Sequence, residues 1–187
     1  MRFAALLIAV CLALPAVAQD PEVPKDVAGS VGATLHFIEN EFLSVAQAMP
    51  EEKYGFVPTA GNFQGVRSFA EQVKHVACAN FAFFNQIEGK KPPEHCEKGG
   101  PNPAKTKAEL IQYLKDSNEY ANRVLKTVNA GNMMQRVNGP YAGPNTRLGM
   151  TVTAVWHITD HYGQIVEYLR MNGIVPPSTA QYGLQVR

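Results

Sequence analysis

Apolar residues recur at steps of three and four positions along four separate stretches of this chain. That spacing is the period of an α-helix with one buried face, whereas the two-residue alternation typical of a half-buried strand is nearly absent. The pattern therefore predicts an all-α protein with four long helices, which we expect at about residues 26–49, 68–87, 106–128 and 145–173.

The ends of these predicted helices carry recognisable signals. Ser68 is followed three positions later by Glu71, and Thr106 by Glu109, which is the capping-box pattern. Gly173 lies where the last helix is expected to stop, and prolines follow it. The apolar stripes expected to face the core are Leu35, Ile38, Phe42, Val45 and Met49 in the first helix, and Leu110, Leu114, Ala121, Val124 and Val128 in the third.

Two long connections indicate how the helices are arranged. A helix of about 20 residues is roughly 30 Å long. The connection from Glu88 to Lys105 is rich in proline and glycine, and at up to about 3.3 Å per residue it could run the full length of such a helix. The second and third helices can then be parallel, which predicts an up-down-down-up four-helix bundle. The connection over residues 129–144 is similarly long.

The first residues have the form of a secretory signal peptide. Arg2 precedes an apolar run over residues 3–14, Pro15 follows, and a small-x-small sequence ends at Ala18. A membrane anchor is the alternative, but the apolar run is shorter than the ~20 residues that a spanning helix needs. Cys11 raises a lipoprotein alternative, which the bulky residue before it disfavours. We expect residues 1–18 to be cleaved and the protein to be secreted or periplasmic.

Cleavage would leave about 170 residues, 19–187, which is enough chain for one domain with its own core, at about residues 27–177. Lys and Arg number 17 against 16 Asp and Glu, and the loss of Arg2 would make the two sets equal. A neutral chain without a basic segment excludes nucleic-acid binding. No second apolar stretch is long enough to span a membrane, so we expect a soluble protein with a small-molecule substrate. The sequence does not determine the oligomeric state, and a homodimer is one candidate, since such bundles often pair.

Two cysteines, Cys78 and Cys96, lie outside the leader. An even pair in an exported protein predicts a disulfide, which would close a loop of about 18 residues and contribute roughly 3 kcal/mol in the chain-entropy model. A redox or metal-binding pair is the alternative, but the two residues lack the CxxC spacing.

Two histidines four positions apart, His157 and His161, share one face of the last predicted helix. Their β-carbons are then about 6 Å apart, so both rings could reach one metal ion, although an HxxxH pair by itself is weak evidence. A zinc-protease HExxH motif is excluded, because Ile158 stands where the glutamate is required. Asp160 is turned about 100° around the helix, where we expect it to support a ligand or to face solvent.

The other histidines are less clearly placed. His75 lies on the second predicted helix among small residues, which leaves room for an ion, but a hydrogen-bonded core histidine is the alternative. His36 fits ordinary helix packing and is a candidate fourth ligand, whereas His95 lies in the Pro- and Gly-rich connection and is expected to face solvent.

Three segments, PEEKYGFVPT, RSFAEQVKHVACANFAFF and HITDHYGQIVEYLRMNGIVPP, together resemble the DinB/YfiT-like superfamily of metalloenzymes. The last segment is the specific one, the second is moderately so, and the resemblance covers about residues 27–177. The matching positions are His75, His157, His161, Gly163, Gln164, Tyr168, Leu169, Arg170, Gly173, Pro176 and Pro177.

The resemblance implies a four-helix bundle in which His75, His157 and His161 hold one divalent ion, with water completing the shell. Zinc or nickel would suit such a site best, and iron or manganese would also bind imidazole. Gln164, Asp160 and Tyr162 are then candidates for the supporting shell around the ligands. Glu167 is a further candidate helper, and Arg170 suits the end of the last helix.

The family resembles thiol-dependent S-transferases and isomerases, and many members are described as stress proteins. Little low-molecular-weight thiol is available outside the cytoplasm, which argues against thiol transfer in an exported member, and the Cys78–Cys96 pair looks like a local addition. The leading hypothesis is therefore a metal-dependent hydrolase or transferase with an open coordination position. A non-catalytic bundle that binds a metal or small molecule is the alternative, because no general base stands beside the histidines. A purely structural bundle is the third.

Overall fold

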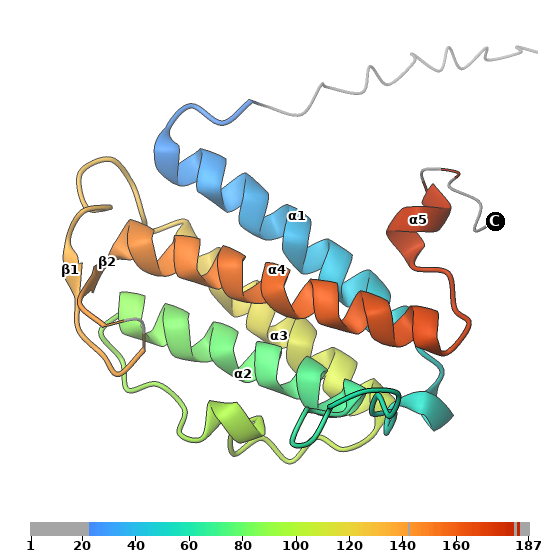
Figure 1. The fold of residues 1–187 in the computed structure, drawn as a ribbon. Coiled ribbons are helices and arrows are strands. Elements are labelled where there is room, and N and C mark those ends of the chain that lie inside the picture. Colours follow the sequence, from blue (N-terminus) through green and yellow to red (C-terminus); the bar gives the residue numbers. More distant parts are fainter. Residues whose placement is uncertain (1–22, 142, 182, 184–187) are drawn as a thin grey trace, which may run out of the picture.

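In the described part of this computed structural model, residues 23–141, 143–181 and 183, four long α-helices lie side by side (Figure 1). They are α1 (Val27–Ala48), α2 (Phe69–Ile87), α3 (Lys107–Leu125) and α4 (Arg147–Met171). The expected signal peptide and Cys11 lie outside the described residues. None of the helices in the described ranges is long and apolar enough to cross a membrane.

The helix directions confirm the predicted up-down-down-up bundle. Figure 1 shows α1 and α4 running one way and α2 and α3 running the other. The connection between α2 and α3 passes along the outside of α2 and contains a short 3-10 helix, η2 (Cys96–Lys98). Helix α2 packs most extensively against α3, and α1 against α4. Since α2 also packs against α4, their facing sides can share a site.

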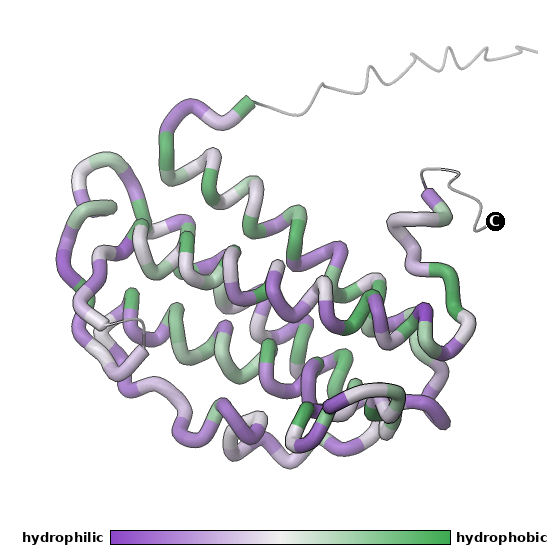
Figure 2. The backbone as a smooth tube through the Cα atoms, in the orientation of Figure 1, coloured by the Kyte–Doolittle hydropathy of each residue, from purple (hydrophilic) through white to green (hydrophobic). Residues whose placement is uncertain are grey.

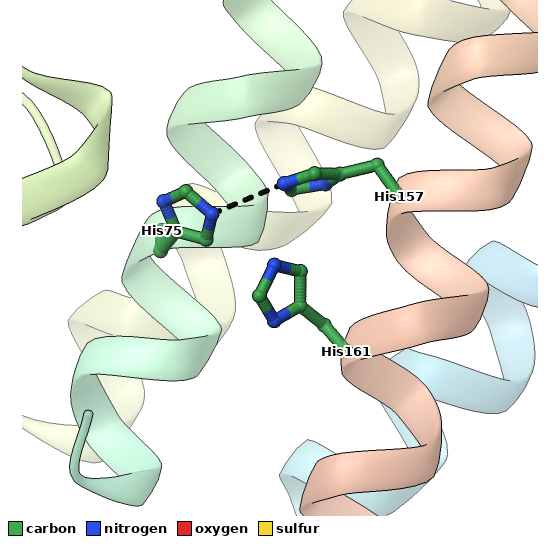
Figure 3. Close-up of side chains that lie close together, drawn as sticks. All are labelled: His75, His157 and His161. Carbon is green, nitrogen blue, oxygen red and sulfur yellow. Dashed lines mark hydrogen bonds between the residues drawn. The ribbon is translucent and has the colours of Figure 1, made fainter. Parts of the chain in front are cut away.

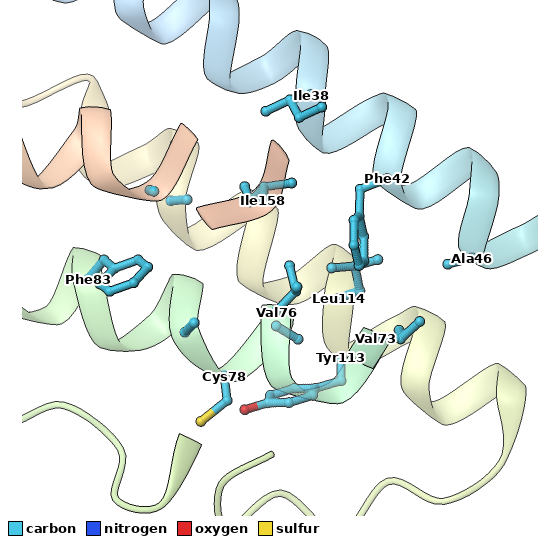
Figure 4. Close-up of a cluster of buried hydrophobic side chains, with 14 of the residues drawn as sticks. Ile38, Phe42, Ala46, Val73, Val76, Cys78, Phe83, Tyr113, Leu114 and Ile158 are labelled. Atoms are coloured by element: carbon cyan, nitrogen blue, oxygen red, sulfur yellow. The ribbon is translucent and has the colours of Figure 1, made fainter. Parts of the chain in front are cut away.

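The core is built from one apolar stripe of each helix. Phe42 of α1, Val76 of α2, Leu114 of α3 and Ile158 of α4 meet at the centre of the bundle (Figure 4), and each is almost fully buried. Burial of a side chain of this size stabilises the fold by roughly 1.5–3 kcal/mol. The stripes expected in α1 and α3 are confirmed as buried. Figure 2 shows that the long connection outside α2 is largely hydrophilic.

Side-chain caps fix where the helices begin. The two capping boxes, Ser68 with Glu71 and Thr106 with Glu109, are both present, as predicted. Thr146 caps α4 by accepting a hydrogen bond from the Gly149 N–H at 3.0 Å. Each such cap stabilises a helix by about 1 kcal/mol.

Helix α3 ends at Leu125, one turn earlier than the predicted end near Val128. The hydroxyl of Thr127 donates to the Val124 carbonyl at 2.7 Å, and the N–H groups of Thr127 and Val128 bond three residues back rather than four. This local competition for carbonyls tightens the chain into a turn. Val128 is nevertheless buried, so its apolar character reflects burial beyond the helix end.

The structure also contains short elements that the periodicity did not predict. A two-residue antiparallel pair, β1 (Arg136–Val137) with β2 (Asn145–Thr146), closes the connection before α4. Such strands are too short to show alternation. The others are a 3-10 turn, η1 (Glu51–Lys53), and a short helix, α5 (Pro177–Gln181), whose first residue is a proline, a residue that helices favour at that position.

One carboxyl group, that of Glu39 in α1, is buried between α1 and α3. Its side chain is 2% exposed, and its Oε2 accepts a hydrogen bond from the Asn122 amide at 2.6 Å. Its Oε1 has no hydrogen-bond partner among the described residues. Burial raises the pKa of Glu39 to about 8, and the Asn122 hydrogen bond opposes that rise. The bundle therefore holds this group in its neutral form at pH 7.

Candidate metal centre

Three imidazole rings from two helices meet on the face that α2 shares with α4. His75 comes from α2, and His157 and His161 come from α4. Their potential ligand atoms all lie within 4.8 Å of one another, and the Nε2 atoms of His75 and His157 are 3.0 Å apart (Figure 3). No other group of this kind occurs among the described residues. The structure thus joins three histidines that are up to 86 residues apart in the chain.

The convergence follows from helix geometry. His157 and His161 are one turn apart on α4 and face α2, as the four-residue spacing predicts. One turn from His75 and one turn from His161, the Gln72 amide donates to the Gln164 side-chain oxygen at 2.8 Å. This hydrogen bond links α2 to α4 beside the rings and restrains the two helices from sliding along each other.

One ring has its tautomer set by a backbone carbonyl. The Nδ1 of His75 is 2.6 Å from the carbonyl oxygen of Cys96, which lies in η2. A carbonyl oxygen can only accept, so Nδ1 carries the hydrogen and Nε2 presents its lone pair toward His157. This is the usual second contact of a metal-binding histidine.

The rings are buried enough to remain neutral. Burial and, to a smaller extent, the neighbouring His161 and His75 together lower the pKa of His157 to about 3. Burial likewise lowers the pKa of His161 to about 4, with His75 adding to the effect and the Asp160 charge opposing it. The pKa of His75 is also lowered, again chiefly by burial. Neutral imidazole is the form that binds a metal ion.

The spacing of the three rings fits a single ion. Two imidazole nitrogens bound to one zinc ion at about 2.0–2.1 Å in a tetrahedral arrangement lie roughly 3.3 Å apart. The 3.0 Å between the nitrogens of His75 and His157 is close to this separation. In addition, the Nδ1 atoms of His157 and His161 are buried without a hydrogen-bond partner among the described residues. The donor set therefore fits a borderline metal ion such as zinc.

Aromatic rings line the outer side of His157. Phe83 of α2 packs edge-on against the His157 ring, with 5.3 Å between the ring centroids, and is itself buried. Trp156, the single tryptophan of the chain, is 64% exposed, and its ring centroid lies 6.5 Å from that of His157. One side of the ligand set is therefore apolar.

A surface hollow of about 440 Å³ lies near the start of α2, where Arg67 forms part of its wall. Arg67 donates two hydrogen bonds to the Glu97 carbonyl, from Nε at 3.2 Å and from Nη2 at 2.8 Å. Its charge helps to lower the pKa of all three histidines, so it lies within electrostatic reach of them. The hollow is lined by Gly65, Val66, Arg67, Glu71, Glu97 and Lys98.

The side chains expected to support the ligands differ in where they lie. Asp160 accepts a hydrogen bond from the Gln164 amide at 2.9 Å, so these two form one chain with Gln72 beside the site. Tyr162 is placed differently from the prediction. Its hydroxyl hydrogen-bonds to Glu41 of α1 and to Ser178 of α5, on another side of α4. The 100° step between neighbouring helical residues explains this separation from His161.

The remaining candidates do not join the cluster. His36 is exposed on α1, with its Nε2 3.1 Å from the Asn40 amide nitrogen, so the candidate fourth ligand was wrong. His95 is exposed in the connection beside η2. Glu167 pairs with Arg170 on the solvent side of α4, with 2.7 Å between the charged atoms.

Sequence reasoning missed several contributors to the site. The Cys96 carbonyl carries no side-chain signal, and the packing of Phe83 on His157 looks like ordinary apolar periodicity. One signal was available. Cys78 follows His75 by three residues, so a Cys78–Cys96 disulfide necessarily brings Cys96 close to His75. In the structure a disulfide joins these two cysteines.

Comparisons with known proteins agree with this architecture. A family model described as the DinB superfamily matches residues 34–165. A DinB-like protein from Bacillus cereus has a similar structure, with a TM-score of 0.65 at 13% identity, over 83% of this chain and 98% of the other. A DinB-like protein from Bacillus subtilis has a TM-score of 0.60 at 19% identity, over 77% of this chain and 92% of the other. A conserved protein from Enterococcus faecalis has a TM-score of 0.59 at 16% identity, over 75% of this chain and 94% of the other. No curated protein matches the sequence.

Proposed function

The chain belongs to the DinB superfamily, and from this premise we propose that it binds one divalent metal ion through His75, His157 and His161 and acts on a small molecule at that ion. The observation that carries the proposal is the meeting of three neutral imidazoles, with their ligand atoms within 4.8 Å of one another. Zinc or nickel suits three imidazoles best, and iron or manganese would also bind.

Three protein ligands are typical of a catalytic rather than a closed structural site, because a coordination position remains for water or substrate. A metal bound there would lower the pKa of a water molecule or polarise a carbonyl or thiol of the substrate. We therefore favour a hydrolase or an S-transferase. The apolar side made by Phe83 would exclude bulk water from the ion, and the positive charge of Arg67 would favour an anionic substrate near it.

The residues around the ligands would hold them in position. The Cys96 carbonyl keeps the His75 Nε2 free of hydrogen, and the Gln72–Gln164 hydrogen bond holds α2 and α4 at a fixed level. Asp160, bonded to Gln164, adds a negative charge that favours a cation near His161. Removal of such supporting contacts typically weakens metal binding by 10- to 100-fold.

Metal analysis tests the proposal directly. After the apo protein is incubated with zinc and passed through a desalting column, we expect about one equivalent of zinc to remain on the wild-type protein. The His157→Ala/His161→Ala variant is expected to retain less than about a tenth of that, because one imidazole cannot hold the ion. Mass spectrometric metal analysis of the purified proteins gives both values.

His36→Ala is the matched control, since His36 is an exposed helical histidine outside the cluster. It should retain as much zinc as the wild type. Equal zinc content in the wild type and in the double variant would refute the ligand assignment. In that case the structural alternative, in which the histidines are polar core groups, predicts that a chelator leaves the melting temperature unchanged.

A non-catalytic binding bundle is the second candidate. The absence of a general base beside the rings, within the part of the chain that the structure describes, favours this candidate. No carboxylate of the described residues accepts a hydrogen bond from any of the three rings. A general base would be expected within hydrogen-bond reach of the reacting group. Zinc-dependent turnover of any ester, amide or thiol conjugate, lost in the His157→Ala/His161→Ala variant, would decide for the enzyme.

We also propose that the protein is exported. The support is the leader-like composition of residues 1–18 together with the disulfide between Cys78 and Cys96, since disulfides persist in oxidising compartments. Intact-mass analysis of the protein from the secreting cell should show a chain that begins at Gln19. A cell-associated chain that retains its first 18 residues would contradict export.

A further inference from the structure

We propose that the Cys78–Cys96 disulfide is a positioning element of the metal centre, because it holds the Cys96 carbonyl against His75 and so aims that ring at the ion. This inference rests on the proposed metal binding and deepens it. It assigns the disulfide a role in metal affinity beyond the constraint that any cross-link places on the unfolded chain.

The first support is that Cys96 contacts two neighbouring turns of α2. Its sulfur is bonded to Cys78, and its carbonyl oxygen lies 2.6 Å from the Nδ1 of His75. His75 and Cys78 are three residues apart on α2, so they lie one turn apart on the same side of the helix. Both cysteines are almost fully buried. The covalent bond therefore fixes the height of η2 against the turn that carries His75.

The second support is that the backbone turn that carries the carbonyl is packed on the disulfide. His95, which precedes Cys96, has a left-handed conformation with φ of 59°, a region that non-glycine residues rarely occupy. Gly99 and Gly100 are also left-handed, and the Gly99 N–H donates to the same Cys96 carbonyl at 2.9 Å. A Cβ added at Gly100 would clash with the Cys78 sulfur, so the turn lies in direct contact with the disulfide.

The third support is what this contact does for the ligand. The carbonyl accepts the Nδ1 hydrogen, which leaves the Nε2 lone pair of His75 facing the His157 ring at 3.0 Å. Without the carbonyl, the ring could adopt the other tautomer or rotate away from the ion. The carbonyl belongs to the backbone, so no side-chain replacement removes it. The disulfide can therefore affect the contact only through the position of the carbonyl.

Other contacts also hold this connection, so we do not expect loss of the fold when the disulfide is absent. Arg67 donates to the Glu97 carbonyl, and the Tyr141 hydroxyl donates to the Pro93 carbonyl at 3.3 Å. The expected effect is therefore the 10- to 100-fold loss of metal affinity that is typical when a contact to a ligating histidine is removed.

The experiment compares the zinc affinity of the wild-type protein with that of the Cys78→Ser/Cys96→Ser variant, by competition with a chromogenic chelator. Ellman's reagent first establishes that the wild type has no free thiol. We expect the variant to bind zinc 10- to 100-fold more weakly while its helical circular dichroism is unchanged. In the metal-free proteins, long-range ¹⁵N–¹H spectra should show one His75 tautomer with hydrogen on Nδ1 in the wild type and a mixture in the variant.

Tyr141→Phe is the matched control, since it releases the same connection at a different point, and its zinc affinity should stay within twofold of the wild type. If the serine variant does not fold, the wild type is reduced in its native state with a trialkylphosphine. The phosphine supplies two electrons to the disulfide, and water supplies the phosphine-oxide oxygen and the two protons of the thiols. The same affinity loss is then expected for the reduced protein.

The outcomes separate this inference from the proposed function. A wild-type protein that binds no zinc would overturn the proposed function and this inference together. Zinc binding that is equal within twofold in the oxidised wild type and in the disulfide-free protein would overturn only the positioning role. Free thiols in the wild type expressed under oxidising conditions would overturn it as well.

Discussion

Protonation of two buried histidines is expected to remove on the order of 7 kcal/mol from the free energy of unfolding of the metal-free protein as the pH falls from about 6.5 to about 3. The cause is the pair of buried rings on α4, where burial lowers the pKa of His157 to about 3 and that of His161 to about 4. In the unfolded chain the pKa of both rings returns to its ordinary value near 6.5, so the unfolded state binds more protons between about pH 6.5 and pH 3. The contribution of these two rings to stability is therefore complete above pH 6.5 and is lost as the pH falls.

Urea unfolding of the metal-free protein at a series of pH values measures this loss. The His157→Gln/His161→Gln variant should lose markedly less stability over the same window, because glutamine takes up no proton. His36→Gln is the matched control, and its profile should follow that of the wild type. Identical slopes for the wild type and the double glutamine variant would show that the two rings do not titrate as buried groups.

The second large effect has the opposite sign and comes from Glu39. Its pKa is raised by burial to about 8, so the folded state keeps a proton that the unfolded chain releases near pH 4.5. Stability is therefore expected to fall, by on the order of 4 kcal/mol, as the pH rises from 4.5 to 8. Glu39→Gln removes this dependence. The amide nitrogen would stand near the unpartnered Oε1 position, so the variant is expected to be about 1 kcal/mol less stable at pH 5.

The order should reverse near pH 6, so that Glu39→Gln is the more stable protein at pH 9. Thermal unfolding at pH 5 and pH 9 suffices to detect the crossing. Glu52→Gln, at an exposed carboxylate in η1, is the control and should behave like the wild type at both pH values. If Glu39→Gln and the wild type show parallel pH profiles, the carboxyl group is not held neutral. The glutamine exchanges at Glu39 and at the two histidines change the pH dependence of stability in opposite directions, so each also serves as a control for the other.

The sequence predicted the bundle because helical periodicity, capping boxes and a long proline-rich connection all indicate the same arrangement. The stripe that includes Leu35 and Phe42 is buried, and the capping boxes at Ser68 and Thr106 are present. What periodicity did not show is local competition for backbone groups. The end of α3 depends on the Thr127 hydroxyl, and the β1–β2 pair is two residues long, so neither leaves a repeating pattern.

The candidate site was predicted less completely. The HxxxH spacing placed His157 and His161 on one face, but the part played by His75 came from the family resemblance, since no spacing within α2 indicates what faces it across the bundle. Tyr162 was misplaced, because sequence adjacency to His161 is not spatial adjacency on a helix. The buried carboxyl of Glu39 also escaped notice, because a glutamate in an amphipathic helix ordinarily faces water.

The position of Trp156 gives the protein an intrinsic spectroscopic probe. Its indole ring is exposed, and its centroid lies 6.5 Å from that of the His157 ring. As the chain has one tryptophan, all indole fluorescence reports from beside His157. Protonation of the neighbouring imidazole, or quenching by a bound paramagnetic ion such as nickel or cobalt, would change its emission, so occupancy can be followed in a label-free titration.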